Sequence, residues 1–303
     1  MTNFIHKPVL AKECIEGLNI KASGIYVDGT LGGGGHAAAI LQKLDDNGLL
    51  IGIDRDAAAI SAAKDKLVGN FRLVRDRHEN IKEILKESPP IDGFLLDLGV
   101  SSHQLDTAER GFSYRYDAPL DMRMDEDSQL TAYDIVNSYP EKELSSIIKR
   151  YGEERYAKRI ARAIRKMDKP VKTTFELAQI VRDAIPGYNP GHPEARTFQA
   201  IRIAVNNELT ELSQTITDMT ELLKPGGRIC IISFHSLEDR IVKQAFKYWS
   251  DPCECPRNIP YCVCETKARL KLISKKPIRP SSQELNDNPR AHSAKLRIAE
   301  RCI

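Results

Sequence analysis

The sequence contains no long hydrophobic run, no N-terminal signal pattern and no internal repeat or low-complexity segment. No apolar stretch approaches the roughly 20 residues that a membrane-spanning helix requires, and the first residues do not resemble a secretory signal. We therefore expect a cytoplasmic protein that does not contact a membrane. The composition, 41% hydrophobic and 29% charged over 303 residues, is typical of a globular protein with one large domain or two modest ones.

A strong overall charge is also missing, because the formal net charge is only +3. That balance hides an asymmetry, since from Thr266 to Ile303 there are ten Lys and Arg residues against three Asp and Glu. A basic segment on a near-neutral body indicates contact with an anionic polymer, although a tail that is merely solvated would have the same composition.

Histidine is absent from the one cysteine-rich stretch of the chain. Four of the seven cysteines form two C-x-C pairs, Cys253 with Cys255 and Cys262 with Cys264. Four thiolates suit a closed tetrahedral zinc site, but C-x-C is tighter than the usual C-x₂-C spacing. We therefore keep zinc as one prediction, with reduced thiols in a proline-pinned loop and redox-labile pairs as the alternatives.

The stretch that organises the chain is a glycine-rich loop. A short apolar strand at 25–27 ends in Asp28, glycines occupy positions 29, 32, 33, 34 and 35, and a good helix start follows at Ala37. In an α/β sheet, a strand, a glycine loop and a helix form a nucleotide pocket, because glycines let a ligand approach the backbone closely. Five glycines between a strand and a helix are hard to explain as a surface turn.

Two acidic residues indicate which nucleotide fits this loop. Asp28 at the strand tip would repel a pyrophosphate, but it suits the ammonium group of S-adenosylmethionine. Asp54 ends the next apolar run, 49–53, about 20 residues past the loop, where a carboxylate can accept both ribose hydroxyls. The pair favours S-adenosylmethionine over NAD.

Strands alternate with helices at a spacing that predicts a parallel, doubly wound sheet. The expected strands lie at 25–27, 49–53, 71–74, 93–98 and 229–233, with two further candidates at 269–274 and 294–301. In the middle of the chain the pattern is helical and polar, with helices near 131–137, 141–150, 153–167 and 174–184. One long helix at 197–223 leads back to the sheet, and Ser236 is expected to cap the helix after the strand at 229–233. The predicted domains are 1–106 with 197–303 for the sheet and 107–196 for the inserted helices.

A third acid, Asp97, ends the fourth expected strand. Ligands of open α/β sheets bind beyond the carboxyl ends of the strands, so we expect Asp28, Asp54 and Asp97 to converge on one crevice. Separately, the expected helix at 153–167 has a basic side opposite its apolar stripe. The basic residues are Arg155, Lys158, Arg159, Arg162 and Lys166. Their sign agrees with that of the tail, so this side is a candidate nucleic-acid surface, with a solvated face as the alternative.

Motifs spread over the whole chain closely resemble those of the MraW (RsmH) family, the bacterial small-subunit ribosomal RNA cytosine-N4 methyltransferases. They are His6-x-Pro-Val-Leu, Asp28-Gly-Thr-Leu-Gly-Gly-Gly-Gly-His36, Leu96-Asp-Leu-Gly-Val-Ser-Ser-x-Gln-Leu-Asp106, Gly111-Phe-Ser, Asp121-Met-Arg-Met-Asp125, Phe198-Gln-Ala-x-Arg-Ile-x-Val-Asn-x-Glu208, Ser233-Phe-His-Ser-Leu-Glu-Asp-Arg240 and Asn288-Pro-Arg290. The resemblance implies a class I S-adenosylmethionine-dependent methyltransferase, with a Rossmann-like α/β sheet and an inserted all-helical domain for substrate recognition.

The resemblance also implies a set of cofactor contacts. They are Gly34, Gly35, His36, Asp54, His78, Asp97 and Gln104. The chain departs from the family at His78, where Phe is usual and where histidine can stack similarly, and at His292, where Arg is more common. The paired cysteines occur in many relatives, which favours a structural role without establishing a metal.

The implied reaction is methyl transfer to the N4 exocyclic amine of a cytosine in the decoding centre of 16S ribosomal RNA, within the small (30S) ribosomal subunit. The N4 lone pair is delocalised into the ring, so a nearby acceptor must hold it toward the methyl group. Asp97 is the expected acceptor, helped by Ser101, although Asp97 could serve only as a cofactor ligand. The alternatives from other classes are an NAD-dependent oxidoreductase and a non-catalytic RNA-binding protein, and whether the chain is a monomer or a homodimer stays open.

Overall fold

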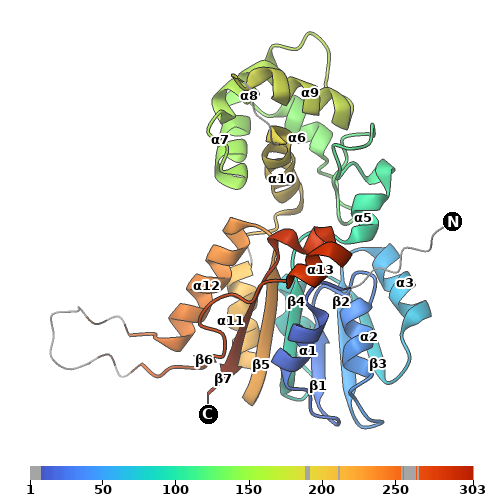
Figure 1. The fold of residues 1–303 in the computed structure, drawn as a ribbon, viewed down its shortest axis with the longest axis vertical. Coiled ribbons are helices and arrows are strands. Elements are labelled where there is room, and N and C mark those ends of the chain that lie inside the picture. Colours follow the sequence, from blue (N-terminus) through green and yellow to red (C-terminus); the bar gives the residue numbers. More distant parts are fainter. Residues whose placement is uncertain are drawn as a thin grey trace. The chain divides into compact units, whose positions relative to one another are not determined.

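The computed structural model describes residues 8–187, 192–210, 212–253, 255, 264 and 266–302. The chain divides into two compact units. We call Met1–Gly99 with Thr210–Ile303 the sheet unit, and Val100–Leu209 the helical unit. Figure 1 draws both as one ribbon coloured along the sequence.

The sheet unit is built on one sheet with the strand order β3-β2-β1-β4-β5-β7-β6. The strands are β1 Ile25–Asp28, β2 Leu49–Asp54, β3 Phe71–Arg75, β4 Ile91–Asp97, β5 Leu223–Ser233, β6 Leu270–Leu272 and β7 Lys295–Arg301. Strands β1 to β5 pair in parallel, whereas β7 runs antiparallel to both β5 and β6. This order places β1 between β2 and β4, so their carboxyl ends lie side by side (Figure 1). It confirms the Rossmann-like α/β fold of class I methyltransferases.

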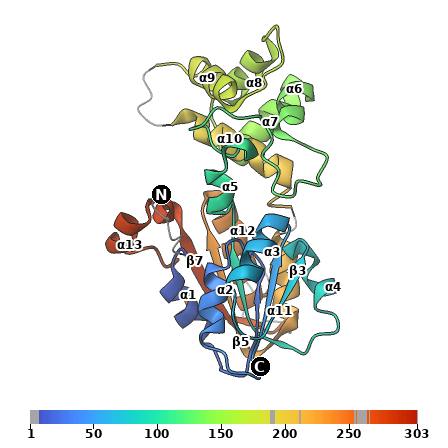
Figure 2. The same ribbon diagram turned by 90° about the vertical axis from the view of Figure 1, so that its right-hand side faces the viewer.

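Helices cover both faces of this sheet. They are α1 Ala11–Leu18, α2 Gly35–Leu41, α3 Ala57–Lys66, α4 Ile81–Ile84, α11 Leu212–Leu222, α12 Ser236–Ser250 and α13 Ser282–Asp287, with the 3₁₀ turns η1 His78–Asn80 and η3 Pro289–Ser293. Successive strand residues point to opposite faces. Val27 and Phe94 therefore pack against α4, α11 and α12, while Tyr26 and Leu95 pack against α1, α2 and α3. Figure 2 shows α1 and α2 on one side of the sheet and α4 and α11 on the other. Burial on both faces explains why the central strands are almost wholly apolar.

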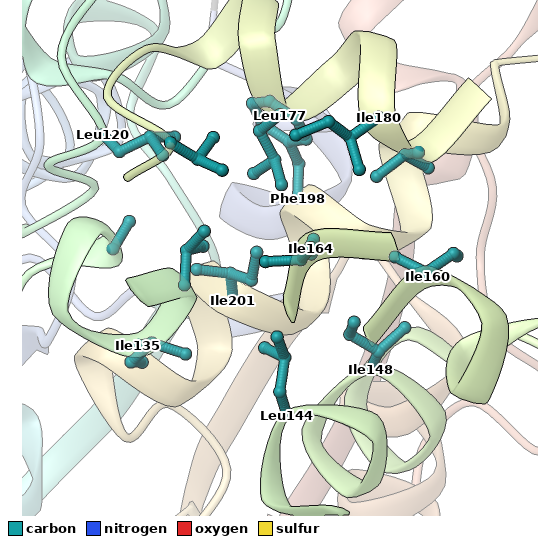
Figure 3. Packing of buried hydrophobic residues seen from close by; sticks show 14 of the residues in the cluster. Leu120, Ile135, Leu144, Ile148, Ile160, Ile164, Leu177, Ile180, Phe198 and Ile201 are labelled. Atoms are coloured by element: carbon teal, nitrogen blue, oxygen red, sulfur yellow. The ribbon is translucent and has the colours of Figure 1, made fainter. Parts of the chain in front are cut away.

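The helical unit folds around a core of its own. Its elements are α5 Ser102–Asp106, η2 Ala108–Arg110, α6 Ala132–Ser138, α7 Glu141–Gly152, α8 Ala157–Arg165, α9 Thr174–Ala184 and α10 Pro193–Asn206. Leu144 and Ile148 on α7 meet Ile160 and Ile164 on α8 through the i, i+4 spacing that places side chains on one helix face (Figure 3). Ile201 of α10 lies in the same core. An all-helical unit is thus inserted into the chain of the α/β fold, and its bounds, Val100–Leu209, are wider than the expected 107–196.

Two helix predictions were wrong in their bounds. The expected helix at 197–223 is interrupted, because α10 ends at Asn206 and Asn207 adopts a left-handed conformation with φ 53°. Asparagine tolerates this region better than most residues, and it often ends helices. The expected helix at 153–167 begins only at Ala157, because Glu153 has φ 50° and ends α7 instead. In the part of the chain that the structure describes, no helix combines the length and apolar character needed to cross a bilayer.

Candidate active site

Three carboxylates end three neighbouring strands of the sheet unit. Asp28 is the last residue of β1, Asp54 of β2 and Asp97 of β4. In the strand register, Asp28 lies opposite Gly52 on β2 and Leu95 on β4, each two residues before the acid of its own strand. The structure therefore brings together the three acids that the sequence placed at strand ends.

Asp28 is the most deeply buried of the three, at 1% exposure. Burial raises its pKa to about 6, although the charge of His36 and the Thr30 N–H act in the opposite direction. Its Oδ1 accepts a hydrogen bond from the Thr30 N–H at 3.2 Å, whereas Oδ2 has no hydrogen-bond partner among the described residues. A buried polar atom without a partner is costly, so this oxygen is suited to a ligand that brings a donor or a positive charge.

Thr30 also connects β1 to β4, and sequence reasoning missed it. Its Oγ1 accepts a hydrogen bond from the Asp97 N–H at 2.5 Å. The same residue therefore contacts the acids that end two adjacent strands. The only local signal was its place between Asp28 and the glycines, which does not reveal a partner 67 positions away.

His36, in the first turn of α2, pairs with Asp97 at the end of β4. Its Nε2 lies 3.6 Å from Asp97 Oδ2, and its side chain is 6% exposed. Burial disfavours the charged imidazole, but Asp97 and Asp28 together outweigh it and raise the pKa of His36. The Nδ1 of His36 and the Oδ1 of Asp97 have no hydrogen-bond partner within the described parts of the chain. The pair thus offers both a donor and an acceptor to a ligand.

The glycine loop is fixed by Asp54. The Gly32 N–H donates to Asp54 Oδ2 at 2.8 Å, and the Asp56 N–H donates to Oδ1 at 2.9 Å. Burial raises the pKa of Asp54, and these two N–H groups oppose that rise. Each carboxylate oxygen keeps a second lone pair, so Asp54 can still accept two further hydrogen bonds.

Gly34 and Gly35 carry the loop into α2. Gly34 precedes the helix with φ +70°, a conformation that favours glycine. A Cβ on Gly35 would lie 3.1 Å from the Cβ of Pro8, so the backbone there is closely packed. These two glycines are needed for chain geometry whatever they bind.

His78 lies on η1, just past the end of β3, and is buried. Burial lowers its pKa, which favours the neutral ring. A Cβ on Gly29 would lie 3.6 Å from the Cβ of His78, so the ring belongs to the surroundings of the loop. A neutral buried imidazole is compatible with the stacking role that the resemblance predicts for His78.

Ser101 and Gln104 belong to the helical unit, where they form the capping box of α5. The Gln104 N–H donates to Ser101 Oγ at 3.2 Å, and the Ser101 N–H donates to Gln104 Oε1 at 3.0 Å. The structure thus gives both side chains a local role, and their predicted roles toward the cofactor and the amine stay predictions.

The end of β5 carries a second capping box that differs from our expectation. His235, not Ser236, caps α12, with its Nδ1 accepting from the Glu238 N–H at 3.4 Å. Glu238 in turn accepts from the Phe234 N–H at 2.8 Å. Histidine is an uncommon cap, so the local sequence favoured the serine.

Three of the four clustered cysteines are described, and the structure gathers them. The thiols of Cys253, Cys255 and Cys264 lie within 4.8 Å of one another. Cys262, the fourth residue of the prediction, lies outside the described residues.

Comparison with known proteins gives a consistent result. A model of the MraW methylase family matches residues 3–302. Relatives from Clostridioides difficile and Halothermothrix orenii, each named ribosomal RNA small subunit methyltransferase H, are both 53% identical to this chain, over 309 and 307 residues. Each alignment covers 98% of this chain and 99% of the relative. The chain therefore belongs to the MraW methylase family.

Proposed function

We propose that the protein transfers a methyl group from S-adenosylmethionine to the N4 amine of a cytosine in the decoding centre of 16S ribosomal RNA. The observation that carries the proposal is the set of acids at the ends of β1, β2 and β4, beside a glycine loop, in a member of a methylase family. Membership of that family argues against the oxidoreductase alternative.

The polar atoms of the site fit this cofactor. Asp28 Oδ2, His36 Nδ1 and Asp97 Oδ1 are buried without hydrogen-bond partners among the described residues, so they can receive the amino-acid end of the ligand. The spare lone pairs of Asp54 suit the two ribose hydroxyls, and His78 suits the adenine. A dinucleotide would instead place its pyrophosphate near Asp28, where the two negative charges would repel each other.

Asp97 is the group that we assign to the amine. The bound cofactor supplies a strongly electrophilic methyl group, so the protein must mainly position the nucleophile. An Asp97 oxygen that accepts a hydrogen bond from N4–H holds the lone pair toward that methyl group and stabilises the positive charge that develops on nitrogen. His36 and the Thr30 hydroxyl fix this carboxylate and its backbone. Ser101 and Gln104 stay in the proposal on the strength of the sequence.

The helical unit is our candidate for the RNA-binding part of the protein. On α8 and just beyond it, exposed basic side chains lie opposite the buried Ile160 and Ile164. We call this set the basic face; its residues are Lys158, Arg159, Arg162 and Lys166. The unit also exposes aromatic side chains that can stack on unpaired bases, namely Tyr116, Tyr133 and Phe175. Basic and aromatic groups on one unit are what single-stranded RNA requires. A cytosine in folded RNA must also be splayed out to reach any such site.

The test is methyl transfer followed by mapping of the product. Small ribosomal subunits from a strain lacking the gene are incubated with purified protein and isotopically labelled cofactor, and the RNA is digested for mass analysis. We expect one labelled N4-methylcytidine, located in the decoding centre. Label on another base or another atom would overturn the assignment.

Two variants separate the catalytic role of Asp97 from a folding role. Asp97→Asn keeps the shape but weakens the acceptor, so transfer should fall by about 10²-fold or more, the usual effect of losing one preorganised group. Asp46→Asn, which changes an exposed acid in the turn before β2, is the matched control and should keep full activity. Full activity in Asp97→Asn would leave Asp97 as a cofactor ligand only.

A further inference from the structure

The segment between α12 and β6 in the sheet unit brings three thiols together, although none of them takes part in the reaction proposed above. Cys264 Sγ lies 3.6 Å from Cys253 Sγ, and Cys255 joins them with all three thiols within 4.8 Å of one another. Cys253 is exposed, and the other two are half-buried. The cluster is therefore accessible from solvent.

Contacts that do not involve only the cysteines join the start and the end of this segment. The Arg269 N–H donates to the Trp249 carbonyl oxygen at 2.8 Å, and the Arg269 guanidinium carbon lies 4.9 Å from the centre of the Trp249 ring. Nearer the thiols, the Thr266 hydroxyl lies 3.0 Å from Cys264 Sγ and 3.3 Å from the Pro252 carbonyl oxygen. These contacts hold the two ends together, so much of the entropy of gathering the ligands is already lost in the folded chain.

We propose that this cluster binds one zinc ion through the thiolates of Cys253, Cys255 and Cys264. Zn–S bonds of about 2.3 Å in tetrahedral geometry place two ligand sulfurs about 3.8 Å apart, close to the separation seen here. A disulfide requires about 2.05 Å, so Cys253 and Cys264 are not bonded to each other. Three converging sulfur ligands select zinc over magnesium or calcium, which prefer oxygen.

A hydroxyl and several basic residues accompany the three thiols. A thiolate has no proton, so in the zinc complex the Thr266 hydroxyl would turn its single proton from the Pro252 carbonyl oxygen to Cys264 Sγ and orient that ligand. Lys267, Arg269 and Lys271 follow in the chain and are exposed, which offsets the negative charge of a zinc–thiolate centre. The proposal rests on the three described thiols, and it is independent of the methyl-transfer function.

Metal analysis of the full-length protein, purified under reducing conditions without chelator, tests the proposal. We expect about one zinc per chain, and replacement by Co²⁺ should give the visible absorption of a thiolate-ligated tetrahedral site. Cys253→Ser with Cys264→Ser should lose the metal. Cys302→Ser, which changes a cysteine outside the cluster, should keep it.

Thiol titration provides a second measurement, which uses the wild-type protein and therefore does not require a variant to fold. Removing zinc from the wild-type protein with a chelator should expose at least three additional thiols to a thiol reagent. The proposal is overturned if the wild type stays metal-free after incubation with excess Zn²⁺, if the double variant retains zinc, or if chelation exposes no additional thiol.

Discussion

Asp28→Asn is expected to stabilise the folded protein above pH 6 and at the same time to weaken its binding of S-adenosylmethionine. Burial raises the pKa of Asp28 from 3.8 to about 6. The folded chain therefore binds this proton more tightly than the unfolded chain does. As a result, the free energy of unfolding falls as the pH rises from about 4 to about 6, and the loss is complete above that range.

The size of the effect follows from the same two pKa values. A difference of about two pH units corresponds to roughly 3 kcal/mol, which is the upper limit for the cost of an ionised Asp28 at neutral pH. Asparagine cannot ionise, and its amide oxygen can still accept from the Thr30 N–H. Its buried NH₂ group loses some solvation, so we expect a net gain of about 1–3 kcal/mol.

Urea unfolding at pH 4, 5, 6 and 7.5 measures this difference. The stability of the variant relative to the wild type should rise between pH 4 and pH 6 and reach the full gain of about 1–3 kcal/mol at pH 7.5. Because the charge of Asp28 helps to raise the pKa of His36, the same pair of curves in a His36→Asn background removes that contribution. A difference that does not depend on pH would refute the reasoning. Calorimetry at pH 7.5 should show weaker cofactor binding, because the ammonium group loses its counter-charge.

Two further predictions concern the loop and the RNA surface. Gly34→Ala and Gly226→Ala both place a side chain at positive φ, +70° and +76°. Each should therefore lower the free energy of unfolding, measured in urea, by about 1 kcal/mol. Only Gly34→Ala should weaken cofactor binding, measured by calorimetry. Equal cofactor affinities for the two variants would contradict a role of the loop. Neutralising Lys158 and Lys166 on the basic face should weaken binding to small subunits and lower the salt slope by about 0.7–0.9 for each phosphate that is no longer neutralised, while cofactor affinity stays unchanged. Filter binding over a salt series measures both changes. The control variant neutralises an exposed lysine pair of the sheet unit, Lys43 with Lys247. Equal salt slopes for the two variants would mean that the basic face is only solvated.

The strand-end acids could be predicted because each one follows a run of apolar residues. A short apolar run identifies a buried strand, and an acid at its end then lies at the ligand-binding edge of the sheet. The link from Thr30 to Asp97 and the pair of His36 with Asp97 could not be predicted in this way. They depend on how β1 and β4 align, and no local pattern contains that register.

The predicted bounds of the helices were wrong for a different reason. Residues 197–223 continue a helical pattern through Asn207, and the propensity of one asparagine is too weak to indicate a stop. The break depends on the left-handed conformation of that residue, at the C-terminal end of α10, close to the boundary between the two units. Local sequence preferences do not reveal where one core ends and the next begins.

Calorimetric titration of S-adenosylmethionine into Asp54→Ala and Asp45→Ala tests the central claim, that the strand ends form the cofactor site. Both carboxylates accept two backbone N–H groups, Asp45 at the amino end of β2 from Asn47 and Gly48, and Asp54 at its carboxyl end. The two variants therefore lose similar local bonds, but only Asp54 is placed to accept the ribose hydroxyls. We expect a loss of roughly 2–4 kcal/mol, tens- to several-hundred-fold in affinity, for Asp54→Ala and wild-type affinity for Asp45→Ala. Unchanged affinity in a folded Asp54→Ala protein would contradict the account.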